Sequence, residues 1–156
     1  SNMPLVGHGE EKLVLAHKMY GFPFLDISGD FGVSSRDNYI IKAMDNEERR
    51  IYSLKDLVFL RYFLSTKFAL FIYSTTAYRM KYLEKYAFEF IPDLCHIPFW
   101  REKIDKIYDL WLDNKMGENI NNNICTSVNE LIYDFFQVTN GERENIEKMH
   151  KTYLMI

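Results

Sequence analysis

The chain is poor in cysteine, and this scarcity limits the compartments that suit it. Its two cysteines, Cys95 and Cys125, are too few for a disulfide framework. The amino end also lacks the charged and apolar pattern of a secretory signal peptide. We therefore expect a protein of the reducing, cytoplasmic compartment.

A long uninterrupted apolar run is also missing. Residues 57 to 73 are apolar or aromatic almost throughout, but Arg61 and Lys67 interrupt them. Either charge is costly in the hydrocarbon core of a bilayer, so the segment does not fit a transmembrane helix. Because nearly every face of such a helix is apolar, we expect a buried core helix instead.

The residue patterns of common catalytic and metal sites do not occur in the sequence. The four histidines and two cysteines lack the paired spacing of a zinc site. The stretch Gly7-His8-Gly9 lacks the third glycine of a dinucleotide loop, and no Gly-Lys-Ser or Gly-Lys-Thr follows. Asp26, Asp30 and Asp37 lie in expected turns, where Asp commonly bonds its own backbone. We therefore predict no catalytic residue and no metal site in this chain.

Apolar residues, in contrast, are sufficient for one domain. At 156 residues and 47% hydrophobic, the chain can bury a core without disulfides or metals. We predict an α+β fold class, in which a small antiparallel sheet packs on a helical hairpin and a helical C-terminal lobe follows. Residues 1–95 are expected to hold the sheet and hairpin, and residues 96–156 the lobe of the same domain.

Short apolar segments bounded by turn residues predict strands in the first third of the chain. The first two strands are expected at residues 12–16 and 22–27, with Pro23 placing the second at a sheet edge. Residues 31–33 and 39–41 bracket a polar loop, which we expect to project Arg36 and Asn38 from a hairpin. Alternating aromatics predict one further strand at residues 86–91.

The middle of the chain predicts two helices between residues 53 and 80. Ser53 is the expected N-cap, with Asp56 favourably placed in the first turn. The polar stretch at residues 65–67 predicts a break, after which the second helix packs back on the first as a helical hairpin. Six apolar residues of this pair are predicted to be buried: Leu57, Leu60, Phe63, Leu64, Phe68 and Phe71.

The last third, from residue 101 to 155, is predicted to be helical. Apolar residues recur at helical spacing from Ile104 to Leu112 and again from Val128 to Phe136. The polar, asparagine-rich stretch at residues 113–126 indicates a mobile loop. Two capping boxes, at residues 127–130 and 139–142, predict that helices begin near Val128 and near Asn140.

Charge is distributed unevenly along the chain. The net charge of −3 argues against a non-specific nucleic-acid binder, which normally carries a basic excess. Residues 36–85 nevertheless hold ten Lys or Arg and six Asp or Glu, whereas residues 111–156 hold four and seven. These are either two solvated surfaces or a basic site beside an acidic lobe. The Arg49-Arg50 pair is likewise either a solvated loop or a phosphate contact.

Several short motifs resemble the carboxyl-terminal region of the N6-adenine DNA methyltransferases of restriction-modification systems. They are the segment Lys12-Leu13-Val14-Leu15, the segment from Phe24 to Val33 with its Asp and Gly residues, Leu60-x-x-x-Leu64-Ser65-Thr66-Lys67-Phe68, Phe88-Glu89-Phe90-Ile91-Pro92, and the tail from Leu131 to Phe136 with Thr139, Glu142, Glu144, Ile146 and Glu147. In that family the third motif usually has Asn-Ser where this chain has Ser65-Thr66. The order of the motifs matches over most of the chain.

The resemblance also shows which family motifs are missing. The family transfers methyl groups with an Asn or Asp followed by two prolines and an aromatic residue. The four prolines here, at positions 4, 23, 92 and 98, are never adjacent, and the glycine-rich methyl-donor loop is absent too. The resemblance therefore implies a non-catalytic target-recognition region. It implies no cofactor in this chain and S-adenosylmethionine in an N-terminal methyltransferase domain of the same or a partner chain. It implies that domain and double-stranded DNA as the partners.

Loop and element-end residues with suitable chemistry are the candidate DNA contacts, because target recognition needs phosphate contacts and side chains that read base edges. They are Lys18, Arg36, Asn38, Thr75, Thr76, Tyr78, Arg79, Lys81 and Lys85. Each is otherwise an ordinary solvated surface residue. The alternative for the whole chain is a protein-interaction or assembly module that uses its acidic helical C-terminal lobe.

Overall fold

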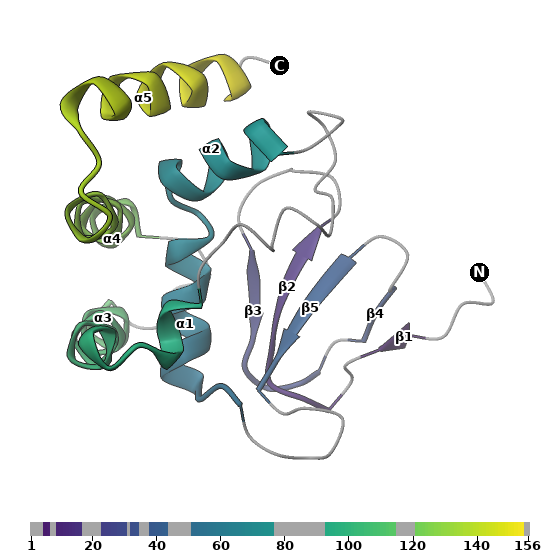
Figure 1. The fold of residues 1–156 in the computed structure, drawn as a ribbon. Helices are drawn as coiled ribbons and strands as arrows, with labels where there is room; N and C mark the ends of the chain where they lie inside the picture. Colours follow the sequence, from purple (N-terminus) through teal and green to yellow (C-terminus); the bar gives the residue numbers. More distant parts are fainter. Residues whose placement is uncertain are drawn as a thin grey trace.

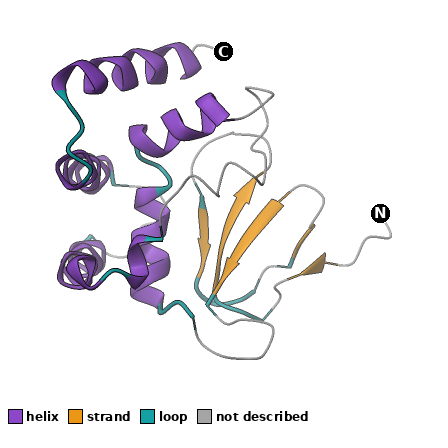
Figure 2. Cartoon of the chain, viewed as in Figure 1, coloured by secondary structure: helices purple, strands orange, loops and turns teal. Residues whose placement is uncertain are grey.

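The computed structural model describes residues 5–6, 9–16, 23–30, 32–34, 38–43, 51–76, 93–114 and 121–154. Figure 1 shows a small sheet on one side of a central helix, with the remaining helices on the other side and above it. Figure 2 separates the strands from the helices in the same view. The predicted α+β class is confirmed.

Three antiparallel strands form the main sheet. The central strand is β2 (Lys12–Ala16), flanked by β3 (Phe24–Asp26) and β5 (Asn38–Lys42). The strand predicted at residues 12–16 is therefore confirmed, and the one predicted at 22–27 exists as the shorter β3. β3 is an edge strand, as predicted from Pro23 directly before it, because proline has no N–H to donate to a neighbouring strand.

A second pairing joins β1 (Leu5–Val6) to β4 (Val33–Ser34). The predicted hairpin between residues 31–33 and 39–41 is therefore wrong, because β4 pairs with β1 while β5 pairs with β2. Asn38 is the first residue of β5 and not part of a loop. Pairing with β2 places Ile41 against the hydrophobic core and gives β5 a five-residue ladder, whereas β4 has two residues.

The central helix α1 (Leu54–Phe63) begins where the sequence predicts. The Ser53 hydroxyl accepts the Asp56 N–H at 3.3 Å, and the Asp56 carboxylate accepts the Ser53 N–H at 2.9 Å. This reciprocal capping box satisfies two donors that the first helical turn leaves free. Every residue from Asp56 to Phe63 is buried, because α1 packs on β2 and β3 on one side and on α3 and α4 on the other.

The predicted break after α1 is confirmed, but the hairpin is not. The Thr66 hydroxyl donates to the Phe63 carbonyl at 2.6 Å and accepts the Ala69 N–H at 3.2 Å, so Thr66 caps α2 (Lys67–Thr76). In Figure 1, α2 runs away from the end of α1 and does not return along it. It packs against α5 and α4 instead.

Two short 3-10 turns, η2 (Leu94–His96) and η3 (Pro98–Trp100), lead into α3 (Arg101–Asp113). Trp100 is fully buried and packs on Phe59 of α1, with 5.6 Å between the ring centroids. The strand predicted at residues 86–91 lies outside the described residues. Leu112 was expected on the apolar face of α3, yet it is exposed.

Helix α4 (Asn122–Phe135) begins earlier than the sequence analysis predicts. The Asn121 side chain accepts the N–H groups of Asn123 and Ile124, so the cap lies there and Ser127 is inside the helix. Ile124 is buried one helical turn before Val128, and its burial favours the longer helix. The start of α5 (Asn140–Leu154) agrees with the predicted capping box of Thr139.

One hydrophobic core joins the sheet to the helices. It runs from Leu13 and Leu15 of β2, through α1, to the inner faces of α3 and α4. Of the six predicted core residues, Leu57, Leu60, Phe63 and Leu64 are buried, whereas Phe68 and Phe71 are half-buried. The division of the chain at residue 95 stays a prediction. Within the described ranges, none of the helices combines the length and the hydropathy that crossing a membrane requires.

Candidate functional site

The strand ends that flank two of the segments predicted to contact DNA lie at one end of the three-stranded sheet. β2 ends at Ala16, β3 begins at Phe24 and β5 begins at Asn38. Ala16 and Asn38 are register partners, and Phe24 pairs with Val14, so the three positions lie at the same end. We call Ala16, Pro23, Phe24 and Asn38 the loop end of the sheet.

Two predicted DNA contacts that are far apart in the sequence are each close along the chain to the loop end. Lys18 follows Ala16 by two residues, and Arg36 precedes Asn38 by two residues. Because Ala16 and Asn38 face each other across the ladder, the chain enters both segments from neighbouring positions. The side chains of Lys18 and Arg36 lie outside the described residues.

The remaining predicted contacts belong to the end of α2 and the segment after it. Thr75 and Thr76 are the last two residues of α2, and their side chains, like that of Asn38, are not described. In Figure 1 the end of α2 and the loop end of the sheet lie on the same upper side of the molecule. The other predicted contacts lie outside the described residues: Tyr78, Arg79, Lys81 and Lys85.

Two residues at the loop end were missed by the sequence analysis as site residues. Phe24 is 45% exposed at the start of the edge strand. Arg61 lies in the last turn of α1, is only 6% exposed, and donates from Nε to the Pro23 carbonyl at 3.2 Å. Burial lowers the pKa of the Arg61 guanidinium. The signal for Arg61 was its position as a charge inside an apolar helix; Phe24 has no comparable signal.

The opposite end of the sheet is closed by a buried ion pair. Lys12 and Asp26 are register partners on β2 and β3, their side chains are almost fully buried, and Lys12 Nζ bonds Asp26 Oδ2. The other carboxylate oxygen, Oδ1, accepts the Gly29 N–H at 3.0 Å. These contacts compensate the buried charge of Asp26 and fix the turn after β3, which is a structural role.

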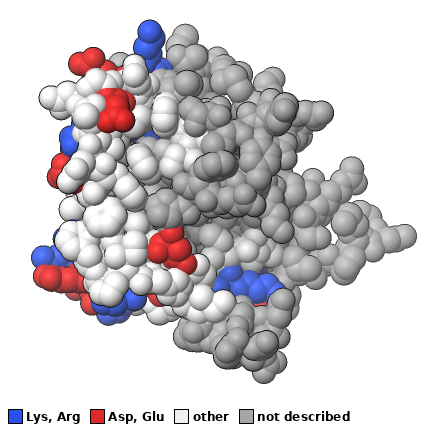
Figure 3. All heavy atoms as spheres, viewed as in Figure 1, with Lys and Arg blue, Asp and Glu red and all other residues white. Residues whose placement is uncertain are grey.

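Basic side chains on the helical part are largely engaged with acidic ones. Lys67 of α2 pairs with Glu147 of α5 at 2.6 Å, and Lys55 of α1 pairs with Asp105 of α3 at 3.5 Å. Arg143 of α5 pairs with both Asp134 and Glu130 of α4. Figure 3 accordingly shows blue and red side chains interspersed along this face, without a large field of one sign. Such a surface attracts phosphates weakly.

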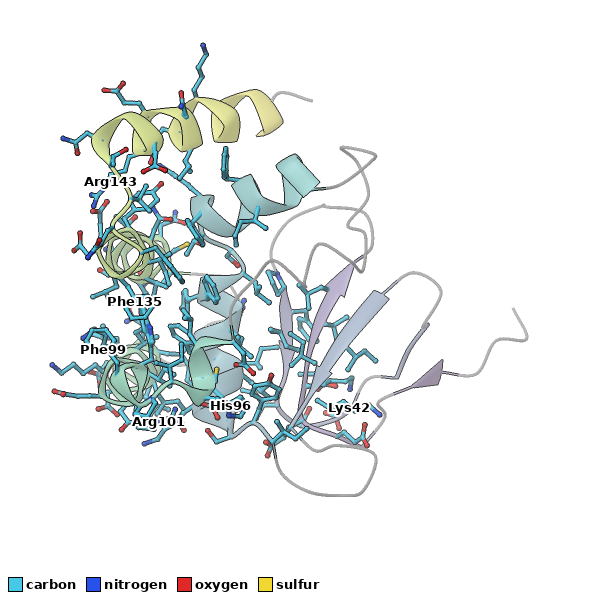
Figure 4. The ribbon with its side chains drawn as sticks, viewed as in Figure 1. Lys42, His96, Phe99, Arg101, Phe135 and Arg143 are labelled. Carbon is cyan, nitrogen blue, oxygen red and sulfur yellow. The ribbon has the colours of Figure 1, made fainter. Side chains whose placement is uncertain are left out.

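A polar cluster of Tyr52, Asp93 and His96 lies below the start of α1. The Tyr52 hydroxyl donates to Asp93 Oδ2 at 3.0 Å, and His96 Nε2 lies 3.3 Å from the same oxygen. Burial, followed by the hydrogen bond to Asp93, raises the pKa of Tyr52. Figure 4 shows His96 at the lower end of the helical part.

Neither nucleophilic nor metal chemistry is supported at this cluster. The neighbouring Cys95 is buried, and its burial raises the pKa of the thiol well above its ordinary value, so the thiol stays protonated and inert. Across the part of the chain that the structure describes, no group of three or more His, Cys, Asp or Glu side chains is placed to hold a metal ion. The cluster links η2 to the start of α1.

No known protein family, no curated protein and no solved structure matches this chain.

Proposed function

We propose that this chain is a non-catalytic DNA target-recognition domain that acts with an N6-adenine DNA methyltransferase of a restriction-modification system. The observation that carries the proposal is the register pair of Ala16 and Asn38, which brings the flanks of Lys18 and Arg36 to one end of the sheet. The resemblance of the sequence motifs to the carboxyl-terminal region of these enzymes supports the same assignment.

Rigid support behind the loop end favours this function over a solvated surface. The sheet rests on α1, and α1 is buried between the sheet and the helices. A recognition surface needs such support, because contacts to base edges tolerate only small displacements. The interspersed charges of the helical face make the loop end the better place for DNA.

The predicted contacts divide into two roles by their chemistry. Arg36 with Asn38 is a pair whose side chains can read guanine and adenine edges in the major groove. Arg79, Lys81 and Lys85 are suited to phosphates, and Thr75, Thr76 and Tyr78 add hydroxyl donors beside them. S-adenosylmethionine belongs to the separate methyltransferase domain, since this chain has neither the methyl-donor loop nor the paired prolines of the family.

Fluorescence anisotropy with a pool of random-sequence duplexes at low salt tests the proposal. We expect the chain to bind the pool and the variant with Arg79, Lys81 and Lys85 all changed to Ala to bind more weakly, with a shallower salt dependence. Lys106→Ala is the matched control, because Lys106 is an exposed cation of α3 that pairs with Glu102 at 3.4 Å. Binding by the parent chain no stronger than that of an unrelated protein of equal net charge would refute the proposal.

A second candidate function is supported by exposed aromatics on the helical lobe. Phe99 is 55% and Phe136 37% exposed. Their rings continue through Phe135, which lies 5.3 Å from Phe99 and 5.0 Å from Phe136 between ring centroids. Figure 4 shows Phe99 and Phe135 pointing toward one another between α3 and α4. An assembly module is the better assignment if light scattering and pull-down experiments reveal a tight oligomer or protein partner and anisotropy reveals no DNA binding.

A further inference from the structure

The outer side of α3 carries charges that no neighbouring side chain neutralises. Within the part of the chain that the structure describes, Lys103, Asp109 and Asp113 form no ion pair, and Lys103 Nζ lies 4.2 Å from the ring centroid of Phe99. The other charged residues of α3 each have a partner of opposite sign, in the pairs Arg101–Asp56, Lys106–Glu102 and Lys55–Asp105. Unneutralised charge is therefore confined to a cation near the start of α3 and acids near its end.

These charges have the wrong sign for their own helix. The start of a helix carries a partial positive charge and its end a partial negative charge, so a cation at the start and an acid at the end are both unfavourable. Lys103 lies in the first turn of α3, Asp113 is its last residue, and its last turn contains no basic residue. A helix that lies antiparallel beside α3 and carries the same charges would offset both effects, because it brings acids to Lys103 and a cation to Asp113.

Exposed apolar side chains lie on the same flank of the helix. Phe99 is 55% and Leu110 46% exposed. Lys103, which contacts the Phe99 ring, precedes Leu110 by seven residues or about two helical turns, and Asp113 follows Leu110 by three. Leu112 is also exposed, but two residues turn a helix by about 200°, so it lies on the other flank. We call Phe99, Lys103, Asp109, Leu110 and Asp113 the α3 flank.

The α3 flank is complementary to a reversed copy of itself. Its first half is aromatic and positive, and its second half is aliphatic and negative. A two-fold axis midway between Lys103 and Leu110 brings the start of α3 in one copy beside the end of α3 in the other. Each Lys103 then faces the acids of the second copy, and each Phe99 lies near Leu110. Lys106 lies near this axis, where its own pair with Glu102 at 3.4 Å compensates its charge.

We propose that the α3 flank is a dimerisation surface, on which a second copy of this chain packs its own α3 in antiparallel orientation. Such a contact uses the same surface on both copies, as a two-fold dimer requires. The proposal goes beyond DNA recognition and does not depend on it. In Figure 1, α3 lies on the opposite side of α1 from the sheet, so the dimer leaves the loop end uncovered. Two helices of 13 residues bury less area than a standard stable interface, so we expect dissociation in the micromolar range.

Sedimentation velocity over a series of protein concentrations in low-salt buffer tests the proposal. We expect the parent chain to pass from monomer to dimer as its concentration rises. Lys103→Glu, and separately the double variant Asp109→Lys with Asp113→Lys, should each stay monomeric, because like charges then meet at both ends of the contact. An equimolar mixture of the two variants should form a heterodimer about as tightly as the parent, since every pair of opposite charges is restored.

Matched controls separate this surface from a general effect of charge or apolar area. Glu144→Lys changes an exposed acid of α5, which packs on α2, and should leave the dimer unchanged. Leu110→Ala should raise the dissociation constant of the dimer about tenfold, whereas Leu112→Ala on the other flank should not change it. Circular dichroism verifies the fold of each variant, and the charge variants decide the matter if Leu110→Ala does not fold.

Three outcomes overturn the proposal. They are a parent chain that stays monomeric at the highest concentration, a dimer that persists in either charge variant alone, and a mixture of the charge variants that does not associate. Anisotropy with duplex DNA is measured separately on the parent chain and on Lys103→Glu. A dimer without DNA binding supports this surface and refutes only the proposed function, whereas DNA binding by a chain that stays monomeric refutes only the dimer.

Discussion

The carboxylate of Asp56 in α1 accepts a hydrogen bond from the guanidinium of Arg101 in α3, with 2.6 Å between Oδ1 and Nη2. The second oxygen, Oδ2, accepts the Ser53 N–H that opens α1. One buried side chain therefore caps the central helix and ties it to the first residue of α3. Two elements 45 positions apart in sequence are aligned by this single carboxylate.

Removing this carboxylate should loosen both helix starts. We expect Asp56→Ala to lower the free energy of unfolding by about 1–3 kcal/mol, because the capping box and the bond to Arg101 are lost together. Urea denaturation measures the effect. Glu102→Ala is the control: it removes an exposed pair with Lys106 in the first turn of α3, and it should change stability by less than about 0.5 kcal/mol. Equal effects of the two substitutions would contradict the role given to Asp56.

Two glycines provide opposite tests of backbone conformation. Gly29 has φ +73°, and a Cβ there would lie 2.6 Å from the Gly9 carbonyl carbon. Gly29→Ala should therefore destabilise the protein by about 1–3 kcal/mol. Gly141 is helical within α5 with no atom in the way, so Gly141→Ala should stabilise by about 0.5–1 kcal/mol. Thermal unfolding of both variants measures whether stability falls or rises. Unchanged stability of the Gly29→Ala variant would show that the turn is misplaced.

Leucine truncation distinguishes the core from the surface of the helical part. Leu60 is 7% exposed in α1, and Leu60→Ala should cost about 2–5 kcal/mol. Leu112 is 40% exposed in α3, and Leu112→Ala should cost less than about 1 kcal/mol. Chemical denaturation compares them directly. A cost for Leu60→Ala below about half a kilocalorie per mole would show that α1 is not the central helix.

If the proposed function holds, substitution of Arg36 and substitution of Arg79 should weaken DNA binding in different ways. Arg36→Ala is expected to cost about 1–3 kcal/mol on a target duplex selected from a randomised pool, and little on random duplex, because it reads a base. Arg79→Ala is expected to weaken binding to both duplexes and to reduce the salt slope by about one phosphate contact. Anisotropy over a salt series separates these effects. If both variants behave like the parent on both duplexes, the site assignment is wrong.

The start of α5 should depend on pH through Glu142. The backbone hydrogen bond from Thr139 to the Glu142 carboxylate lowers the pKa of Glu142 below its ordinary value of 4.5. The carboxylate therefore stabilises the helix start at pH values above the unfolded pKa, and this stabilisation is lost as the pH falls through the folded value. Nuclear magnetic resonance titration of Glu142 should yield the lowered pKa. Thr139→Ala should raise this pKa only part of the way, because the substitution removes the weaker side-chain hydrogen bond and keeps the backbone N–H. An ordinary pKa in the parent chain would contradict the capping box.

Local signals were sufficient for several elements. Ser53 and Thr139 correctly predicted the starts of α1 and α5, because a capping box satisfies free N–H groups within one helical turn. The strand at Lys12–Ala16 and the break at Thr66 were equally local. The misplaced start of α4 shows where such signals fail, since Asn121 and the capping-competent Ser127 both precede apolar residues and only the burial of Ile124 selects the first.

The candidate site was only partly accessible from the sequence. Residue chemistry suggested Arg36 and Lys18, but nothing in the order of residues related them. The pairing of Ala16 with Asn38 supplies that relation. Arg61 was visible only as an interruption of an apolar run, because its partner, the carbonyl of Pro23, lies on a distant strand.

The sequence by itself determined the α+β class, the N-caps of α1 and α5 and most of the apolar segments that form the core, because these depend on hydrogen bonds and hydrophobic periodicity within a few residues. Only the tertiary structure decided that β4 pairs with β1, that α2 leaves α1 to pack on α5, and that Asp26 closes the sheet with Lys12. Such choices depend on which apolar surfaces and buried charges meet across the whole chain, and a local pattern is compatible with more than one partner.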